Sequence, residues 1–175
     1  TEVSHVNMFN IAPNDTLHVD FCEYGGVDYI VLVDRLTGYI RAEQTPNQGT
    51  DSAIQVIKNW SLLFGYPLKI ISDGGGGFRD DFIQKLRDLN VKHTHSSSYH
   101  SQSNSRAERA VGSLKNSLKK STKHITKLGL QELIFQINSN ISSEMTGSAN
   151  DRFLLRSVRL SLIHISEPTI PAIIS

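Results

Sequence analysis

Several features that would mark other protein classes are scarce in this sequence of 175 residues. It has a single cysteine, Cys22, which excludes an internal disulfide and a zinc site built from several cysteines. No run of 18 or more apolar residues occurs, so no membrane-spanning helix is expected. The opening stretch TEVSHVNMFN has neither the basic start nor the apolar core of a signal peptide, which favours an intracellular, reducing compartment.

Charge is nearly balanced over the whole chain but unevenly placed along it. The length and the apolar fraction of 38% suit one domain with a hydrophobic core, and the formal net charge of +1 favours no particular partner. Between Arg106 and Lys127, however, seven lysines and arginines accompany a single acid, Glu108. Such a stripe is typical of a face that binds nucleic acid, although a solvated helix surface gives the same pattern.

Alternation of apolar and polar residues dominates the first part of the chain. It runs through residues 15–24, residues 27–34 form a second, more buried apolar stretch, and residues 39–45 form a third. Short turns containing glycine separate these three stretches. The pattern predicts three strands joined as an antiparallel meander.

After residue 46 the period changes to that of helices alternating with short strands. Residues 51–64 carry apolar side chains at helical spacing, with Thr50 or Asp51 as the expected N-cap and Gly65 then Pro67 as the stop. The remaining predicted elements are a strand at 68–73, a helix at 80–90, a strand at 91–96, a long helix at 106–125 and a helix at 128–139. The order predicts an α/β domain in which helices flank a five-stranded mixed sheet.

The last residues break this pattern. From residue 160 the chain reads LSLIHISEPTIPAIIS, with no continuation of the charge or apolar period before it. LSLIHISEPT resembles the translation of a sequencing-library adapter. We therefore predict an α/β domain over residues 1–159 and a non-native tail over residues 160–175, the alternative being a genuine apolar segment.

Two aspartates lie at positions where a carboxylate could bind a metal ion or a ligand. Asp20 lies in the middle of an apolar strand, where a carboxylate needs a charged partner or a metal ion, unless its strand face is exposed. Asp73 ends a strand and precedes four glycines, so it can reach a ligand at the sheet edge. The simpler role for Asp73 is to start a turn.

Glu108 has two readings as well. With Ser105 it forms an S-x-x-E capping box, which would tie it to its own helix. On a helical wheel it shares a face with Lys115 and Lys119, beside the apolar face made by Ala107, Val111, Leu114 and Leu118. A carboxylate there can face a groove whose lysines bind phosphates.

Taken together, Asp20, Asp73 and Glu108 indicate one chemistry. Hard oxygen ligands suit Mg²⁺, and two such ions about 4 Å apart promote phosphoryl transfer. The three acids can converge if the first strand, the middle strand and the long helix are neighbours.

Other candidate sites have weaker support. His93, His95 and His100, together with Cys22, could suggest a zinc site, but His93 and His95 lie on one strand face without a clear fourth ligand. The rival carboxylates lie at a turn or a helix start: Asp34, Asp80 and Asp81.

Three motifs follow one another in the chain: HVDF at 18–21, ISDGGGGF at 71–78 and YHSQSNSRAERAVGSLKNSLK at 99–119. In this order they resemble the catalytic core of retroviral and gypsy-like LTR-retrotransposon integrases, of the ribonuclease H-like superfamily. The resemblance covers roughly residues 12–155. The 34 residues between Asp73 and Glu108 are close to the family's usual spacing.

The resemblance implies roles for particular residues. The family's metal-binding acids match Asp20, Asp73 and Glu108, which implies a polynucleotidyl transferase with endonuclease activity that uses two Mg²⁺ or Mn²⁺ ions. It would trim the 3′ ends of element DNA and join them to target DNA. A catalytically inactive, integrase-derived remnant that binds DNA is the alternative. The DNA contacts that the family suggests are Tyr99, Gln102, Asn104, Lys115 and Lys119.

The family also implies other copies of the same chain as partners, no membrane association and a nuclear location. Departures from the family pattern concern the loop near the site: Ser101 stands where proline is usual, Ser105 where glycine is usual, and Gly76 and Gly77 where proline and a polar residue are common. The family's N-terminal zinc domain and C-terminal DNA-binding domain have no counterpart in this sequence. We therefore expect a fragment of a longer polyprotein product.

Overall fold

The computed structural model describes residues 12–96, 105–121, 125–140 and 146–156, with the side chains of residues 105–107 left aside. Its strands are β1 (Thr16–Tyr24), β2 (Val27–Asp34), β3 (Ile40–Thr45), β4 (Lys69–Ser72) and β5 (Lys92–His95). They form one five-stranded sheet in the order β3-β2-β1-β4-β5. The helices are α1 (Thr50–Phe64), α2 (Asp80–Asp88), α3 (Ser105–Lys120), α4 (Lys127–Ser139) and α5 (Ala149–Leu154), with a 3-10 turn η1 (Gly76–Phe78).

The predicted meander and the mixed sheet are confirmed. β1 pairs antiparallel with β2, and β2 pairs antiparallel with β3. β4 adds to the other side of β1 in parallel, and β5 adds in parallel to β4. β1 therefore lies at the centre of the sheet, next to β4, which ends one residue before Asp73.

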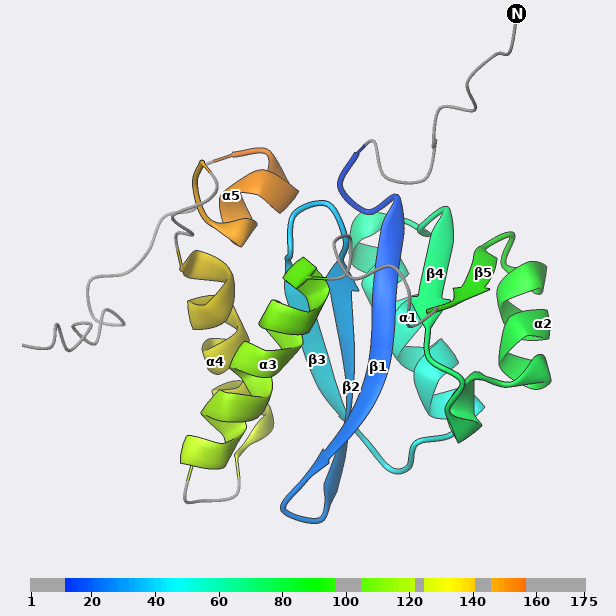
Figure 1. Cartoon of the computed structure of the whole chain (residues 1–175), viewed down its shortest axis with the longest axis horizontal. Helices are drawn as coiled ribbons and strands as arrows, with labels where there is room; N and C mark the ends of the chain where they lie inside the picture. Colours follow the sequence, from blue (N-terminus) through cyan, green and yellow to red (C-terminus); the bar gives the residue numbers. More distant parts are fainter. Residues whose placement is uncertain (1–11, 97–104, 122–124, 141–145, 157–175) are drawn as a thin grey trace, which may run out of the picture.

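Helices lie on both faces of the sheet (Figure 1). Each face buries its own apolar cluster. Alternate residues of β1, such as Leu17 and Val19, pack with α1 and α2 on one face. Residues of β2 and β3 pack with Leu114 and Leu118 of α3 and with α4 on the other. His18, Asp20 and Cys22 alternate with the first set and so point toward the α3 face.

The start of α1 differs from the prediction. Gly49, not Thr50 or Asp51, is its N-cap, and no side chain caps it. The Asn47 carboxamide oxygen instead accepts from Gly49 N at 2.9 Å and from Ser52 Oγ at 2.9 Å. At the other end the predicted stop is confirmed, because Gly65 has a φ of 84°, a conformation that glycine adopts without strain.

The helices that follow β5 also differ from the prediction. α3 ends at Lys120, short of the predicted residue 125, and Thr126 begins the next helix by accepting a hydrogen bond from Gly129 N. α5 was not predicted, although Ser148 and Asp151 form a reciprocal capping box at its start. In the described part of the chain, no helix is long and apolar enough to cross a membrane. The proposed tail, 160–175, lies outside the described residues.

Candidate active site

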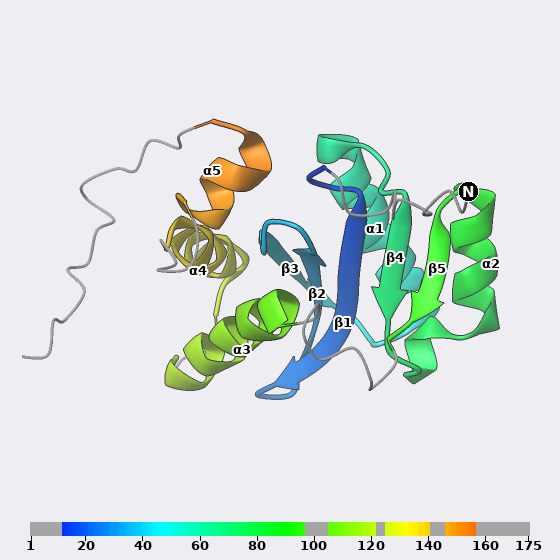
Figure 2. The same cartoon turned by 45° about the horizontal axis from the view of Figure 1, so that its top comes forward.

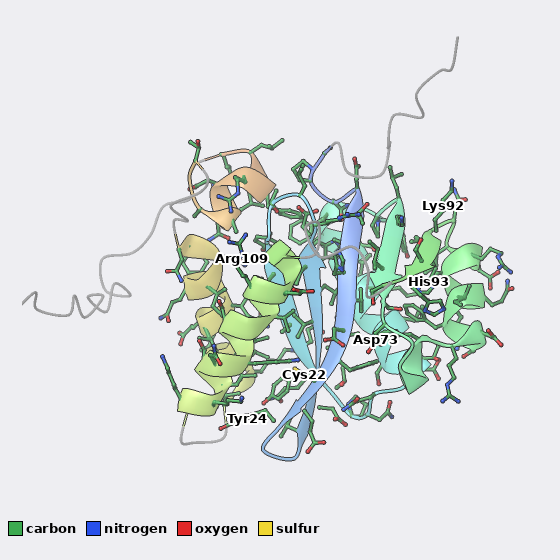
Figure 3. All side chains as sticks on the ribbon, in the orientation of Figure 1. Cys22, Tyr24, Asp73, Lys92, His93 and Arg109 are labelled. Atoms are coloured by element: carbon green, nitrogen blue, oxygen red, sulfur yellow. The ribbon has the colours of Figure 1, made fainter. Side chains whose placement is uncertain are left out.

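The register of the two central parallel strands brings the first two acids together. Val19 of β1 lies opposite Ser72 of β4, so the residues that follow, Asp20 and Asp73, occupy neighbouring positions at this edge. β1 continues toward Tyr24, whereas β4 stops at Ser72. Asp73 is therefore the first residue to leave the sheet, beside a carboxylate that remains in it (Figure 3).

α3 supplies the third acid and a cation. It packs against β1 and β2, and two turns separate Glu108 from Lys115, which places both on one side of the helix. A pocket of about 350 Å³ lies between α3 and the sheet. It is lined by the three acids, by Lys115 and by His18, Val19, Ile71, Ser72, Ser96, Val111 and Gly112.

The electrostatics of Asp20 reflect this enclosure. Partial burial raises the pKa of the Asp20 carboxyl above its ordinary value, and the nearby charge of Asp73 raises it further. The ammonium of Lys115 acts in the opposite direction. The ammonium of Lys115 therefore partly offsets the negative charge of the Asp20 carboxylate.

Asp73 is held by its own loop. Its Oδ1 accepts a hydrogen bond from Gly75 N at 2.9 Å, and its carbonyl oxygen lies 3.4 Å from His95 Nδ1. Within the glycine run, Gly77 packs tightly, because a Cβ there would clash with the carbonyl oxygen of Gln48, whereas a Cβ on Gly76 would meet nothing within 4 Å. At Gly77 the loop therefore closely approaches the segment before α1.

His18 is a pocket residue that the sequence analysis did not single out. Burial, followed by the positive charges of Arg35 and Lys69, lowers its pKa to about 4. Its Nε2 is buried without a hydrogen-bond partner in the described part of the chain. Strand alternation put His18 on the same face as Asp20, and that alternation was the available signal.

A second histidine, His93, contacts the end of β4, the strand that precedes Asp73. His93 Nε2 lies 2.8 Å from Ser72 Oγ, and its ring packs edge-on against Phe82 at 5.7 Å. The ring of His95 is 4.8 Å away. The predicted common face of the two histidines agrees with this contact, and the Ser72 bond ties β5 to the end of β4.

The acids suit a divalent cation in their chemistry, and they line a common pocket. Three carboxylates from separate elements line one pocket, and Asp20 carries a charge that a cation would stabilise. Among the described residues, no three acid, histidine or cysteine side chains are grouped closely enough to hold an ion. Side-chain rotation of Asp73 and Glu108, both exposed, is therefore needed to complete such a site.

Several predicted site residues are placed elsewhere or not described. Lys119 is exposed and does not line the pocket, although its carbonyl oxygen accepts from the Tyr24 hydroxyl at 3.3 Å. Tyr99, Gln102 and Asn104 lie outside the described residues, as does the side chain of Ser105 that the capping-box reading requires.

The rival carboxylates have structural roles. Asp34 is fully buried and accepts hydrogen bonds from Asn14 N, Thr37 N and Thr37 Oγ1, at 2.8, 2.8 and 2.6 Å. It therefore holds the turn after β2. Asp81 pairs with Lys85 within α2 at 3.0 Å.

A family model described as the integrase core domain matches residues 11–101, just over half of the chain. The chain belongs to the integrase core family. The match includes Asp20 and Asp73 and ends before Glu108, so the place of Glu108 in the site depends on the geometry of α3.

Retroviral polyproteins are similar to this integrase core. The Gag-Pro-Pol polyprotein of Simian retrovirus SRV-2 is 28% identical over 160 residues, or 85% of this chain. The Pol polyprotein of caprine arthritis encephalitis virus (strain Cork) is 36% identical over 104 residues, or 58% of this chain. The matched region is 9% of each relative's length.

Solved structures show the same fold. The catalytic core domain of BIV integrase aligns with a TM-score of 0.70 and 17% identity, covering 81% of this chain and 95% of that one. The HTLV-2 integrase catalytic core in complex with magnesium, in a trimeric form, aligns with a TM-score of 0.66 and 19% identity, covering 82% and 99%. The predicted ribonuclease H-like fold is confirmed.

Proposed function

We propose that this integrase core is a metal-dependent polynucleotidyl transferase that processes the 3′ ends of element DNA and joins them to target DNA. The observation that supports it is the pocket that Asp20, Asp73 and Glu108 line together. Asp20 lies on the central strand β1 and Glu108 on the packed helix α3, and Asp73 directly follows β4, so two of the three acids start from rigid elements.

Asp20, Asp73 and Glu108 would hold two Mg²⁺ or Mn²⁺ ions. The chemistry that such paired cations supply is neutralisation of the charge that develops on the attacking and leaving oxygens. The HTLV-2 core with a similar fold was solved in complex with magnesium, which supports magnesium as the metal.

The chain's own groups position the DNA. Lys115 lies at the pocket beside Asp20, where an ammonium can bind a phosphate once a metal replaces it as the partner of the carboxylate. Glu108 is exposed in the first turn of α3, so it can close onto the pocket without moving the backbone. Burial of His18 keeps its ring neutral near pH 7, so it adds no positive charge beside the ligands.

A DNA-binding remnant without turnover is the second candidate, because the three carboxylates are not grouped to hold an ion in this conformation. Both candidates bind DNA through Lys115 and the exposed Lys119. We also propose that copies of this chain associate, as the dimeric and trimeric HTLV-2 cores do, and that it acts in the nucleus.

Disintegration of a branched DNA substrate tests the proposal. The wild-type chain should resolve the branch with Mg²⁺ or Mn²⁺ and not with EDTA. Asp73→Asn and Glu108→Gln should each lower the rate at least 100-fold while DNA affinity stays within about twofold. Glu132→Gln, which changes an exposed acid on α4, is the matched control and should act like wild type.

Two results would contradict the assignment. Full metal-dependent cleavage by Glu108→Gln would remove Glu108 from the site. Salt-sensitive DNA binding by the wild-type chain, without turnover at any metal concentration, would favour the remnant. A location test uses a fluorescent fusion, and exclusion from the nucleus would contradict that part of the proposal.

A further inference from the structure

Of the three acids that line the pocket, Asp73 is the one that lies outside a strand or helix. β4 ends at Ser72, and residues 74–77 are all glycine, the residue that restricts the backbone least. A Cβ on Gly74 or Gly76 would meet nothing within 4 Å, so the first part of this loop is loosely surrounded. The position of Asp73 therefore depends on contacts made by the neighbouring strands.

Two side chains at the ends of β4 and β5 contact the carbonyl oxygen of Asp73. Ser72 Oγ donates a hydrogen bond to this oxygen at 3.2 Å, and His95 Nδ1 lies 3.4 Å from it. Because a carbonyl oxygen can only accept, His95 donates from Nδ1. The two contacts hold the planar peptide group between Asp73 and Gly74, which restricts the backbone rotation that orients the Asp73 side chain.

His93 holds the Ser72 hydroxyl in place. Its Nε2 lies 2.8 Å from Ser72 Oγ, and Ser72 is buried. The hydroxyl has one proton, which it donates to the Asp73 carbonyl, so it accepts from His93 Nε2. Burial lowers the pKa of His93, and the charge of His95 lowers it further, which keeps the His93 ring neutral near pH 7. His93, Ser72 and the Asp73 carbonyl thus form a directed chain of hydrogen bonds.

The two imidazoles lie on the face of the sheet opposite α3. His93 pairs with Ile70 of β4, which belongs to the cluster buried under α1 and α2, and its ring packs against Phe82 of α2. His95, two residues further on, points to the same face. Figure 2 shows β4 and β5 side by side, with α2 flanking β5. Neither histidine is among the described residues that line the pocket of the three acids, so both act on Asp73 through its backbone.

We propose that His93, Ser72 and His95 are positioning residues that hold the backbone of Asp73 so that its carboxylate can bind a divalent cation in the pocket. This rests on the proposed function. With the backbone held, rotation of the Asp73 side chain away from Gly75 N, which donates to Oδ1 at 2.9 Å, is sufficient to turn the carboxylate toward the pocket. Loss of a partner that orients a metal ligand weakens metal binding or activity roughly 10- to 100-fold.

Calorimetric titration of the whole chain with Mn²⁺ tests the proposal without turnover. His93→Phe keeps a ring against Phe82 but lacks the donor, whereas His93→Gln keeps an N–H donor. His93→Phe and Ser72→Ala should each weaken Mn²⁺ affinity about tenfold, and His93→Gln should bind like wild type. The double variant should lose little more, because both changes break the same chain of hydrogen bonds. Thr94→Val, at an exposed position of the same strand, is the matched control.

The exposed residue His95 supplies a variant that leaves the core intact. His95→Phe should also weaken Mn²⁺ binding, by a smaller factor because its contact is longer, and His95→Asn should not, since its side chain keeps an N–H donor. A purely structural role would lower the melting temperature of the metal-free variants and leave the Mn²⁺ affinity of the folded chain unchanged. If His93→Phe does not fold, Ser72→Ala and His95→Phe decide the question.

Three results would overturn the proposal. They are wild-type Mn²⁺ affinity in the variants that lack the donor or the hydroxyl, equal losses in His93→Phe and His93→Gln, and no Mn²⁺ binding by the wild-type chain. The Mn²⁺ concentration for half-maximal resolution of branched DNA should rise by the same factor as the dissociation constant. The expected Mn²⁺ affinities, in a wild-type chain that does not resolve branched DNA, would support the positioning role and contradict the proposed function alone.

Discussion

Asp20 and Asp73 are adjacent where β4 leaves the sheet, because Val19 and Ser72 are partners in the parallel register just before them. One carboxylate stays in a half-buried strand, and the other projects from an exposed turn. Burial and the charge of Asp73 raise the pKa of Asp20, so its ionised form is unfavourable for the fold. The pairing therefore does not stabilise the metal-free fold, as expected if the proposed function is correct and the two acids bind a cation.

Replacing Asp20 by Asn should stabilise the metal-free chain while abolishing turnover. A group whose pKa is raised on folding costs stability above that pKa, and Asn removes the charge at nearly constant volume. We expect the melting temperature to rise by about 2 °C without metal. Differential scanning fluorimetry with and without Mn²⁺ measures this, and Mn²⁺ should stabilise the wild type only. A lower melting temperature without metal would show that the carboxylate has a structural role.

Acid should destabilise the chain through His18. Its pKa is 6.5 in the unfolded chain and about 4 in the fold, so between these values only the unfolded chain gains the proton. Stability due to this group is complete above pH 6.5 and is lost as the pH falls toward 4. From pH 7 to pH 5 the wild type should lose about 2 kcal/mol more than His18→Gln, as measured by urea unfolding. Because Asp20 titrates in the opposite sense in both proteins, the difference isolates His18. Equal losses would contradict this prediction.

Much of the fold could be predicted because each strand and helix has its own period. The alternation in residues 16–24 and the helical spacing in residues 50–64 are local properties, and both elements were found. α5 was missed because six residues give too little periodicity, although its S-x-x-D start could have been recognised. The choice of Gly49 as the start of α1 depends on the Asn47 side chain, which no local pattern indicates.

The site was partly predictable for a related reason. Motifs identified the three acids, and the parallel pairing of β1 and β4 then brought the first two together. The place of His18 in the pocket and the pairing of Ser72 with His95 depend on strand register. Register is a relation between distant segments, and spacing along one segment does not contain it.

Replacing Asn138 should lower stability, because its side chain hydrogen-bonds to the backbone of the edge strand β3. Its Oδ1 accepts from Ile40 N at 2.9 Å, and its Nδ2 donates to Ile40 O at 2.8 Å, so α4 satisfies both backbone groups of one β3 residue. Asn138→Ala would leave two buried groups without partners, at a cost of about 3 kcal/mol. Chemical denaturation measures the loss. Gln136→Ala, at an exposed position of the same helix, should change stability by less than about 0.5 kcal/mol.

Two adjacent glycines after Asp73 should respond differently to alanine. A Cβ on Gly77 would lie 2.3 Å from Gln48 O and 2.7 Å from Phe21 Cε2, whereas a Cβ on Gly76 would meet nothing within 4 Å. Gly77→Ala should therefore lower stability by about 1–3 kcal/mol and reduce branched-DNA turnover, because the loop that holds Asp73 must shift. Gly76→Ala is the matched control and should keep both. Similar losses in the two variants would indicate that chain flexibility matters and not the close approach.

Substitutions of Gly112 should change stability and turnover in opposite directions. It lies inside α3 and lines the pocket of the three acids one turn from Glu108, and a Cβ there would meet nothing within 4 Å. Glycine costs a helix roughly 0.5–1 kcal/mol relative to alanine, so Gly112→Ala should stabilise the chain by about that amount. The added methyl group also enters the pocket where DNA would lie, and turnover should fall, more so in Gly112→Leu. Ser113→Ala, at an exposed position of the same helix, should leave turnover unchanged. If Gly112→Leu raises the melting temperature and keeps full activity, the space beside Glu108 is not used by the substrate.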